Sequence, residues 1–200
     1  FEVPVDTQVE RAVRKAIDQL SEMGAEVREI SMPMFHQTAP ISTTILYSEA
    51  TAYHRDLVLS KGAQYAAPVR LRIESGFFIS GEQYLQAQRA RALFTRKCRE
   101  LFDEVDILAG PMEPMTAHPI GATQVQINDA TVGSVPALTQ YTRAFNLNGF
   151  PAITVPCGFS DDDLPIGLQL AGKPFDESTV LRAAHAYETS TDWHKRRPPV

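Results

Sequence analysis

The chain has 200 residues and a mass of 22.2 kDa, a length that allows one large domain or two small ones. Its 24 acidic and 19 basic residues give a net charge of −5, which argues against a general nucleic-acid binder, because such proteins present a basic surface. Apolar residues make up 44% of the chain, as in ordinary globular proteins, and no apolar run approaches the roughly 18 residues of a membrane span, so we expect no membrane partner.

The chain opens with Phe1 rather than methionine, and we therefore expect it to be processed or to be a fragment of something longer. Asp6 predicts the start of a helix over 7–23, in which apolar residues recur at three- or four-residue spacing. A strand is expected over 25–31. A loop over 34–44 and a helix over about 43–60 follow.

The middle of the chain is less regular. Residues 61–79 are compatible with a short helix, a strand, or both. A helix over 80–104 is the clearest element, because Ser80 and Gln83 have the spacing of a capping box. The short apolar run over 105–110 predicts a buried strand, and a proline-rich loop over 111–121 follows it.

The C-terminal part alternates strands and helices. We expect a strand and turn within 122–135 and a short helix near 136–146. A strand rich in β-branched residues over 151–159 and another strand over 164–172 are separated by an acidic turn, which predicts an antiparallel pair. A last helix is expected over about 177–190. The alternation favours an α/β fold with a mixed sheet flanked by helices, and residues 1–200 show no interior domain boundary.

The sequence contains no complete catalytic constellation. It has no nucleophile elbow and no phosphate-binding glycine motif. Its five histidines never pair at i, i+4 and never adjoin a cysteine, so we expect no metal and no cofactor. The two cysteines, Cys98 and Cys157, are far apart, which predicts buried thiols in a reducing compartment, the cytoplasm.

Three polar segments have competing interpretations. Asp161, Asp162 and Asp163 form a solvated turn or a cation site, but the ligand spacing of a calcium loop is absent. The basic run 195–197 is a solvated tail or a phosphate contact. The loop 111–121 is the best local candidate for function, because open α/β sheets place ligand clefts beyond the carboxyl ends of their strands. Its alternative role is a proline-stiffened connection.

The run FNLNGFPAITVPCGF (145–159), followed by LPIGLQLAGKPFDESTVLRAAHAYE (164–188), closely resembles the C-terminal part of amidase signature enzymes. That family includes amidases and the A subunits of tRNA-dependent amidotransferases. The helix SGEQYLQAQRAR (80–91) and the segment DILAGPMEPMTAHPIG (106–121) are also similar to it. The resemblance covers nearly the whole chain and implies the C-terminal portion of the amidase signature fold.

The resemblance implies amide hydrolysis by a nucleophilic Ser, a bridging Ser and a Lys base, with backbone N–H groups as an oxyanion hole. In the family the two serines and the lysine lie upstream of the matched region, the serines in a Gly/Ser-rich segment, and this sequence has no such run. None of the five lysines has the context of the catalytic one. We therefore expect no catalytic residue in this chain and no hydrolysis by the chain alone.

The resemblance also suggests residues that face a substrate pocket. Thr142 and Asn146 match the family's Thr-x-x-x-Asn pattern, and Tyr84 matches a Tyr-containing helix start. For each, a purely structural role is the alternative. The A subunits of amidotransferases generally carry an Asp a few residues before the Thr-x-x-x-Asn pattern, where this chain has Thr139, and this favours a stand-alone amidase.

These observations predict the C-terminal half of an amidase that binds a small amide together with a missing N-terminal half. A fragment of an amidotransferase A-type chain and a non-catalytic binding or assembly module are the alternatives. Because a separated half exposes sheet edges and apolar faces, we also expect a homo-oligomer.

Overall fold

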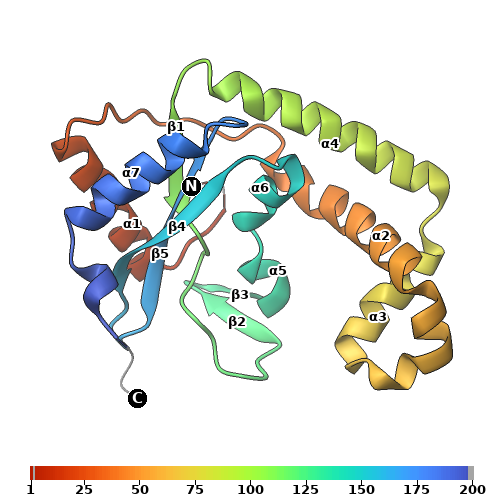
Figure 1. Cartoon of the computed structure of the whole chain (residues 1–200). Helices are drawn as coiled ribbons and strands as arrows, with labels where there is room; N and C mark the ends of the chain where they lie inside the picture. Colours follow the sequence, from red (N-terminus) through yellow and green to blue (C-terminus); the bar gives the residue numbers. More distant parts are fainter. Residues whose placement is uncertain (2, 198–200) are drawn as a thin grey trace. The chain divides into compact units, whose positions relative to one another are not determined.

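The computed structural model describes Phe1 and residues 3–197 (Figure 1). The chain forms two compact units. One unit consists of Phe1–Pro33 together with Cys98–Val200, and the other, which we call the helical unit, is Met34–Lys97. Each unit is described by itself below. The expectation of one domain without an interior boundary stays a prediction.

The first unit is built on a three-stranded sheet with the order β1-β5-β4. Its strands are β1 (Ile107–Pro111), β4 (Ala152–Phe159) and β5 (Pro165–Gly172). Both pairs are antiparallel, and a register shift between Pro156 and Gly158 interrupts the β4–β5 ladder. The predicted antiparallel pairing of the last two strands is therefore confirmed.

Two helices, α1 (Thr7–Glu22) and α7 (Glu177–Thr189), cover one face of this sheet (Figure 1). A β-carbon on Gly172 would lie 2.5 Å from Val180 of α7, and one on Gly158 would lie 3.2 Å from Ala12 of α1. Gly158 of β4 pairs with Ile166 of β5, so the two residues face the same side of the sheet. Ile166 and Gly172 are separated by an even number of positions on β5. Side chains alternate along a strand, so both glycines face the same side and both helices pack there.

The core of this unit lies between the sheet and the two helices. Leu168 and Leu170 of β5 are fully buried. The two helices contact β4 and β5 and contribute buried small and β-branched residues: Val9, Val13, Ala16, Val180 and Ala184. Burying one such leucine contributes about 1.5–3 kcal/mol, so this interface stabilises the unit. Asp6 caps α1 by accepting a 2.9 Å hydrogen bond from the backbone N–H of Gln8.

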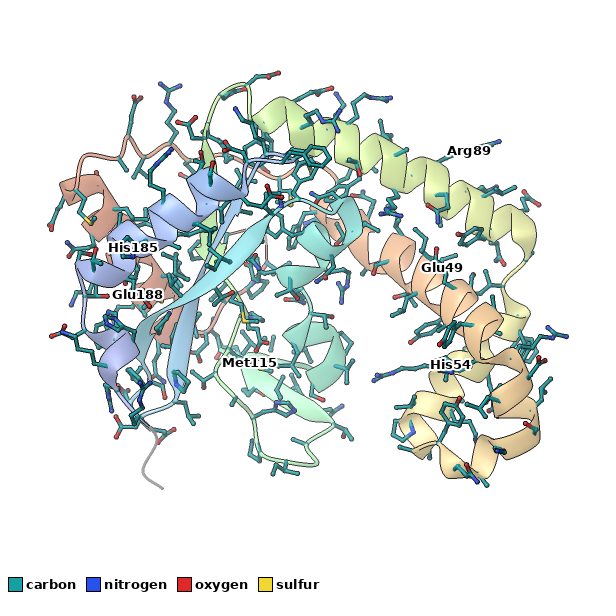
Figure 2. All side chains as sticks on the ribbon, in the orientation of Figure 1. Glu49, His54, Arg89, Met115, His185 and Glu188 are labelled. Carbon is teal, nitrogen blue, oxygen red and sulfur yellow. The ribbon has the colours of Figure 1, made fainter. Side chains whose placement is uncertain are left out.

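A hairpin and two short helices complete the first unit. The hairpin consists of β2 (Gln124–Ile127) and β3 (Ala130–Gly133), and the helices are α5 (Ser134–Leu138) and α6 (Thr142–Asn148). Met115, from the loop after β1, packs with Val125, Ile127 and Ala137 in a small cluster of buried side chains. Figure 2 shows Met115 beside the hairpin.

The helical unit contains α2 (Thr38–Lys61), α3 (Ala67–Ser75) and most of α4 (Gly81–Leu101). The 3-10 turn η1 (Phe35–Gln37) precedes α2, and two more, η2 (Gly62–Gln64) and η3 (Gly76–Phe78), join the three helices. Thr51 of α2 donates a hydrogen bond to the carbonyl of Ile73, and Gly76 leaves no room for a β-carbon beside Thr51 and Tyr47. These contacts hold α2 and α3 together. No helix of the described residues is long and apolar enough to span a bilayer.

Several predictions of local structure are confirmed. The helix over 7–23 is α1, the helix over 177–190 is α7, and the helix over 80–104 is α4. Ser80 and Gln83 form the predicted capping box, with reciprocal hydrogen bonds of 2.8 and 3.1 Å. The α/β class is confirmed too. The sequence predicted a mixed sheet, whereas the strand pairs of the described residues are all antiparallel.

Other predictions were wrong. Residues 25–31 form no strand, and Val27 is 52% exposed. An extended segment becomes a strand only when a neighbouring strand completes its hydrogen-bond ladder. The helix expected from 43 begins at Thr38, since Pro40 is tolerated in a first helical turn. The single helix near 136–146 is two helices, α5 and α6. Strand β1 is an edge strand of the described sheet and is only partly buried.

Candidate functional site

The pattern Thr-x-x-x-Asn lies on α6, where Thr142 and Asn146 are one helical turn apart. The side-chain amide of Asn146 donates a 2.9 Å hydrogen bond to the backbone carbonyl of Thr142. Thr142 is half-buried and Asn146 is exposed. The structure therefore brings these two predicted residues together. The amide oxygen of Asn146 remains on the exposed side of the helix, where it can accept a hydrogen bond.

The turn after α6 explains the Asn-Gly-Phe-Pro sequence. Gly149 has a φ of 73°, and its N–H donates a 2.9 Å hydrogen bond to the carbonyl of Phe145. A left-handed residue in this position is a common way to end a helix. The side-chain oxygen of Asn148 accepts a 2.9 Å hydrogen bond from the N–H of Phe150. Together these bonds direct the chain from α6 into β4, so the motif positions the helix against the sheet.

Arg143 lies between Thr142 and Asn146 and was not singled out from the sequence. Its guanidinium donates hydrogen bonds to the hydroxyl of Thr139 and, at 3.5 Å, to the carbonyl of Pro136. Burial lowers the pKa of Arg143, although a guanidinium stays charged at any physiological pH. A partly desolvated cation on this helix can hold a carbonyl or carboxylate oxygen. In the sequence, the only indication of this cation was a single Arg within the Thr-x-x-x-Asn motif.

Tyr84 belongs to the helical unit, in the first turns of α4. Its hydroxyl donates a 2.9 Å hydrogen bond to Glu49 of α2 and accepts one of 2.8 Å from the side-chain amide of Gln88. Figure 2 shows Glu49 on α2. The hydroxyl therefore already has a donor and an acceptor within its own unit. The partner Glu49 was missed, because nothing in the sequence relates residues 35 positions apart.

The loop after β1 divides into a structural and a polar part. Met115 and Pro114 are buried, and the carbonyl of Pro114 accepts a 2.7 Å hydrogen bond from the N–H of Asp6. Glu113 and His118 are half-buried. Burial raises the pKa of the Glu113 carboxyl, and the charge of His118 opposes that shift. The loop thus holds a half-buried carboxyl group and a half-buried imidazole, and its apolar residues act as a connection.

The remaining candidates have structural roles. The aspartates 161–163 are exposed, and Asp163 accepts a 2.9 Å hydrogen bond from Arg196, whose guanidinium lies 3.7 Å from the centre of the Phe159 ring. Cys98 and Cys157 are free and buried, as predicted. In the part of the chain that the structure describes, no three His, Cys, Asp or Glu residues gather as metal ligands.

Known proteins resemble this chain along nearly all of its length. The family model described as Amidase matches residues 1–181. An amidase of Pseudomonas putida is 43% identical over 197 residues, which are 98% of this chain and 42% of the relative. The A subunit of a glutamyl-tRNA(Gln) amidotransferase from Roseiflexus sp. is 38% identical over 228 residues, covering 100% of this chain and 45% of the relative.

The fold has a close counterpart among solved structures. A crystal structure of an amidase superimposes with a TM-score of 0.88 over 93% of this chain and 42% of that chain, at 24% identity. At this identity the likeness concerns the fold alone. The chain thus spans less than half the length of the curated relatives that it matches.

Proposed function

The chain belongs to the amidase family, and on that premise we propose that it is the C-terminal portion of an amide hydrolase whose Ser-Ser-Lys centre lies in an upstream portion. The sequence lacks a Gly/Ser-rich run that resembles the family's catalytic segment. The chain would complete the sheet and the pocket for a small amide. A cytoplasmic location is part of this proposal, in keeping with two free thiols.

The observation that carries the proposal is the exposure of every lysine. Lys15, Lys61, Lys97, Lys173 and Lys195 all lie at the surface. A lysine acts as a general base only when it is neutral, and burial or a neighbouring cation is what makes it so near pH 7. No lysine of this chain is therefore held neutral as a base in the chain alone, which is expected to be inactive.

The test is to join this chain to the upstream portion of the 43% identical Pseudomonas putida amidase, in place of that enzyme's own C-terminal portion. Release of ammonia from benzamide is measured for the chimera, for the upstream portion alone and for this chain alone. Activity of the chimera only is the expected result. Hydrolysis by this chain alone would contradict the assignment of the catalytic centre.

Part of a tRNA-dependent amidotransferase is the second candidate, because relatives with that name also match the whole chain. The higher identity to an amidase and the presence of Thr139 favour the hydrolase. In the structure the hydroxyl of Thr139 accepts a hydrogen bond from Arg143. An Asp at position 139 would form an ion pair with this Arg instead. A chimera that releases ammonia from glutamine in preference to benzamide would favour the amidotransferase instead. A folded but inactive chimera would favour the alternative of a non-catalytic binding or assembly module.

Self-association is also part of the proposal. Leu46, Tyr53 and Leu57 recur at helical spacing on α2 and are 58%, 85% and 46% exposed. An apolar stripe on the solvated side of a helix usually marks an interaction surface. Replacing Leu46 and Leu57 by Lys should lower the mass measured by light scattering towards 22.2 kDa. A parent chain that already has the monomer mass at every concentration would contradict self-association.

A further inference from the structure

A pocket of about 240 Å³ opens in the first unit, between α1, β4, α7 and the short helix η4 (Trp193–Lys195). Figure 1 shows α1, α7 and β4 meeting in this part of the molecule. Its lining includes side chains from all four elements: Lys15 and Ala16, Cys157, Tyr187, Asp192 and Trp193. The proposed function assigns no role to any of these residues.

The interior of the pocket is neutral. Ala16, Cys157 and Tyr187 are 2%, 4% and 1% exposed. Burial raises the pKa of the Cys157 thiol to about 12, and that of the Tyr187 hydroxyl also to about 12. Neither group therefore ionises near neutral pH. Trp193 adds a half-buried indole ring. These side chains form an apolar, aromatic surface that favours a planar apolar group.

The lining of the pocket carries one cation, Lys15, and one anion, Asp192. Asp192 accepts a 2.5 Å hydrogen bond from Lys195, so its carboxylate is already neutralised. The neighbouring cations of α1 are paired as well, Arg11 with Asp161 and Arg14 with Glu10. Within the described residues Lys15 makes no ion pair and is exposed. Its ammonium group is thus available to an anion. His185 and Glu188, labelled in Figure 2, lie on α7 and do not line the pocket.

We propose that this pocket binds a small aromatic carboxylate, with its ring against Trp193 and Ala16 and its carboxylate at Lys15. The volume corresponds to roughly eight water molecules, enough for a single ring with a carboxylate. A ligand of this size has few contacts, and we expect a dissociation constant on the order of 1 mM.

The experiment uses a natural reporter, because Trp193 is the only tryptophan of the chain. The full chain is titrated with benzoate while the indole fluorescence is followed. Benzamide and benzylamine have the same ring with a neutral and a cationic group, and they serve as matched ligands. Lys15→Met removes the ammonium and keeps the length of the side chain. Lys173→Met is the control, since Lys173 is an exposed lysine of the same unit outside the pocket.

The expected result is a saturable change with benzoate, and at least about fivefold weaker binding of benzamide and benzylamine, since a charge-assisted hydrogen bond is lost. Lys15→Met should weaken benzoate binding to the level of benzamide, and Lys173→Met should not change it. The proposal is overturned by a signal that does not saturate, by equal affinities for benzoate and benzamide, or by an unchanged affinity in Lys15→Met. The test measures binding and not hydrolysis, so its outcome is independent of the proposed amidase function.

Discussion

Tyr84 and Glu49 join two helices of the helical unit through one 2.9 Å hydrogen bond, from the phenolic hydroxyl to the carboxylate. Gln88 donates to the same hydroxyl at 2.8 Å and approaches the carboxylate at 3.4 Å. The hydroxyl of a residue expected in a substrate pocket is thus used within the protein. A substrate contact through this hydroxyl would have to displace Glu49 or Gln88. The aromatic ring carries no such restriction.

Tyr84→Phe tests how much this bond contributes. The variant keeps the ring and leaves Glu49 and Gln88 without their shared partner. We expect the free energy of unfolding to fall by about 1 kcal/mol, the usual net value of one hydrogen bond. The measurement is urea denaturation followed by circular dichroism, which reports the helices.

Tyr53→Phe is the matched control, because Tyr53 is on α2 and is 85% exposed. Its effect should lie within about 0.5 kcal/mol, as for most surface substitutions. Combining Tyr84→Phe with Glu49→Ala should cost less than the sum of the two single changes, since both remove the same bond. Strictly additive costs would show that the two residues are not coupled.

Gly149→Ala tests the turn that links α6 to β4. A β-carbon here would meet nothing within 4 Å, so any cost comes from the backbone, whose φ is 73°. A non-glycine residue in this left-handed region costs about 1–2 kcal/mol, and we expect that loss of stability. Gly110→Ala is the control, because its β-carbon also meets nothing within 4 Å and its φ is not positive. Equal effects of the two substitutions would refute the role of the left-handed turn.

The elements that could be predicted from sequence are those whose signal is local. The helix caps at Asp6 and Ser80 depend on residues two or three positions away, and both are confirmed. The pairing of β4 with β5 followed from a short acidic turn between two apolar runs. Family resemblance singled out Thr142 and Asn146, and the structure places them on the same helical turn.

The failures depend on distant parts of the chain. Residues 25–31 contain the β-branched residues Val27 and Ile30, yet a strand needs a neighbour that the local sequence does not reveal. The bond between Tyr84 and Glu49 spans 35 positions, and the pocket at Lys15 and Trp193 joins residues near opposite ends of the sequence. Such relations arise from tertiary packing, which periodicity and spacing do not encode.

Asn146→Ala tests the predicted substrate contact in the active chimera. The side chain is exposed and its hydrogen bond is confined to one helical turn, so the loss of stability should be small. If the amide holds the substrate equally in the ground and transition states, KM should rise about fivefold while kcat changes less than about twofold. Steady-state kinetics with benzamide measure both. Thr123→Val, at an exposed loop position, is the control. An unchanged KM would exclude Asn146 from the pocket.

The buried thiols predict a loss of stability in alkali. Burial raises the pKa of Cys157 from 9.0 to about 12 and that of Cys98 from 9.0 to about 11, against the opposing effect of the Asn148 side chain. In the unfolded chain a thiol loses its proton near pH 9, whereas in the folded chain it keeps it to a higher pH. Above about pH 9 the unfolded state therefore binds fewer protons, and stability falls as the pH rises through the folded pKa values.

Cys157→Ala tests the contribution of one of these two thiols to the pH dependence of stability. At about pH 8 the variant should be less stable than the parent, because a buried sulfur is lost. Between about pH 9 and about pH 10.5 its free energy of unfolding should fall less steeply than that of the parent. The difference between the two slopes should be about 1.4 kcal/mol per pH unit. Urea denaturation at a series of pH values measures this slope. Val155→Ala removes a buried side chain of the same strand that cannot ionise, so its cost should be constant with pH. Parallel pH profiles for the parent and Cys157→Ala would mean that this thiol is not held neutral by burial.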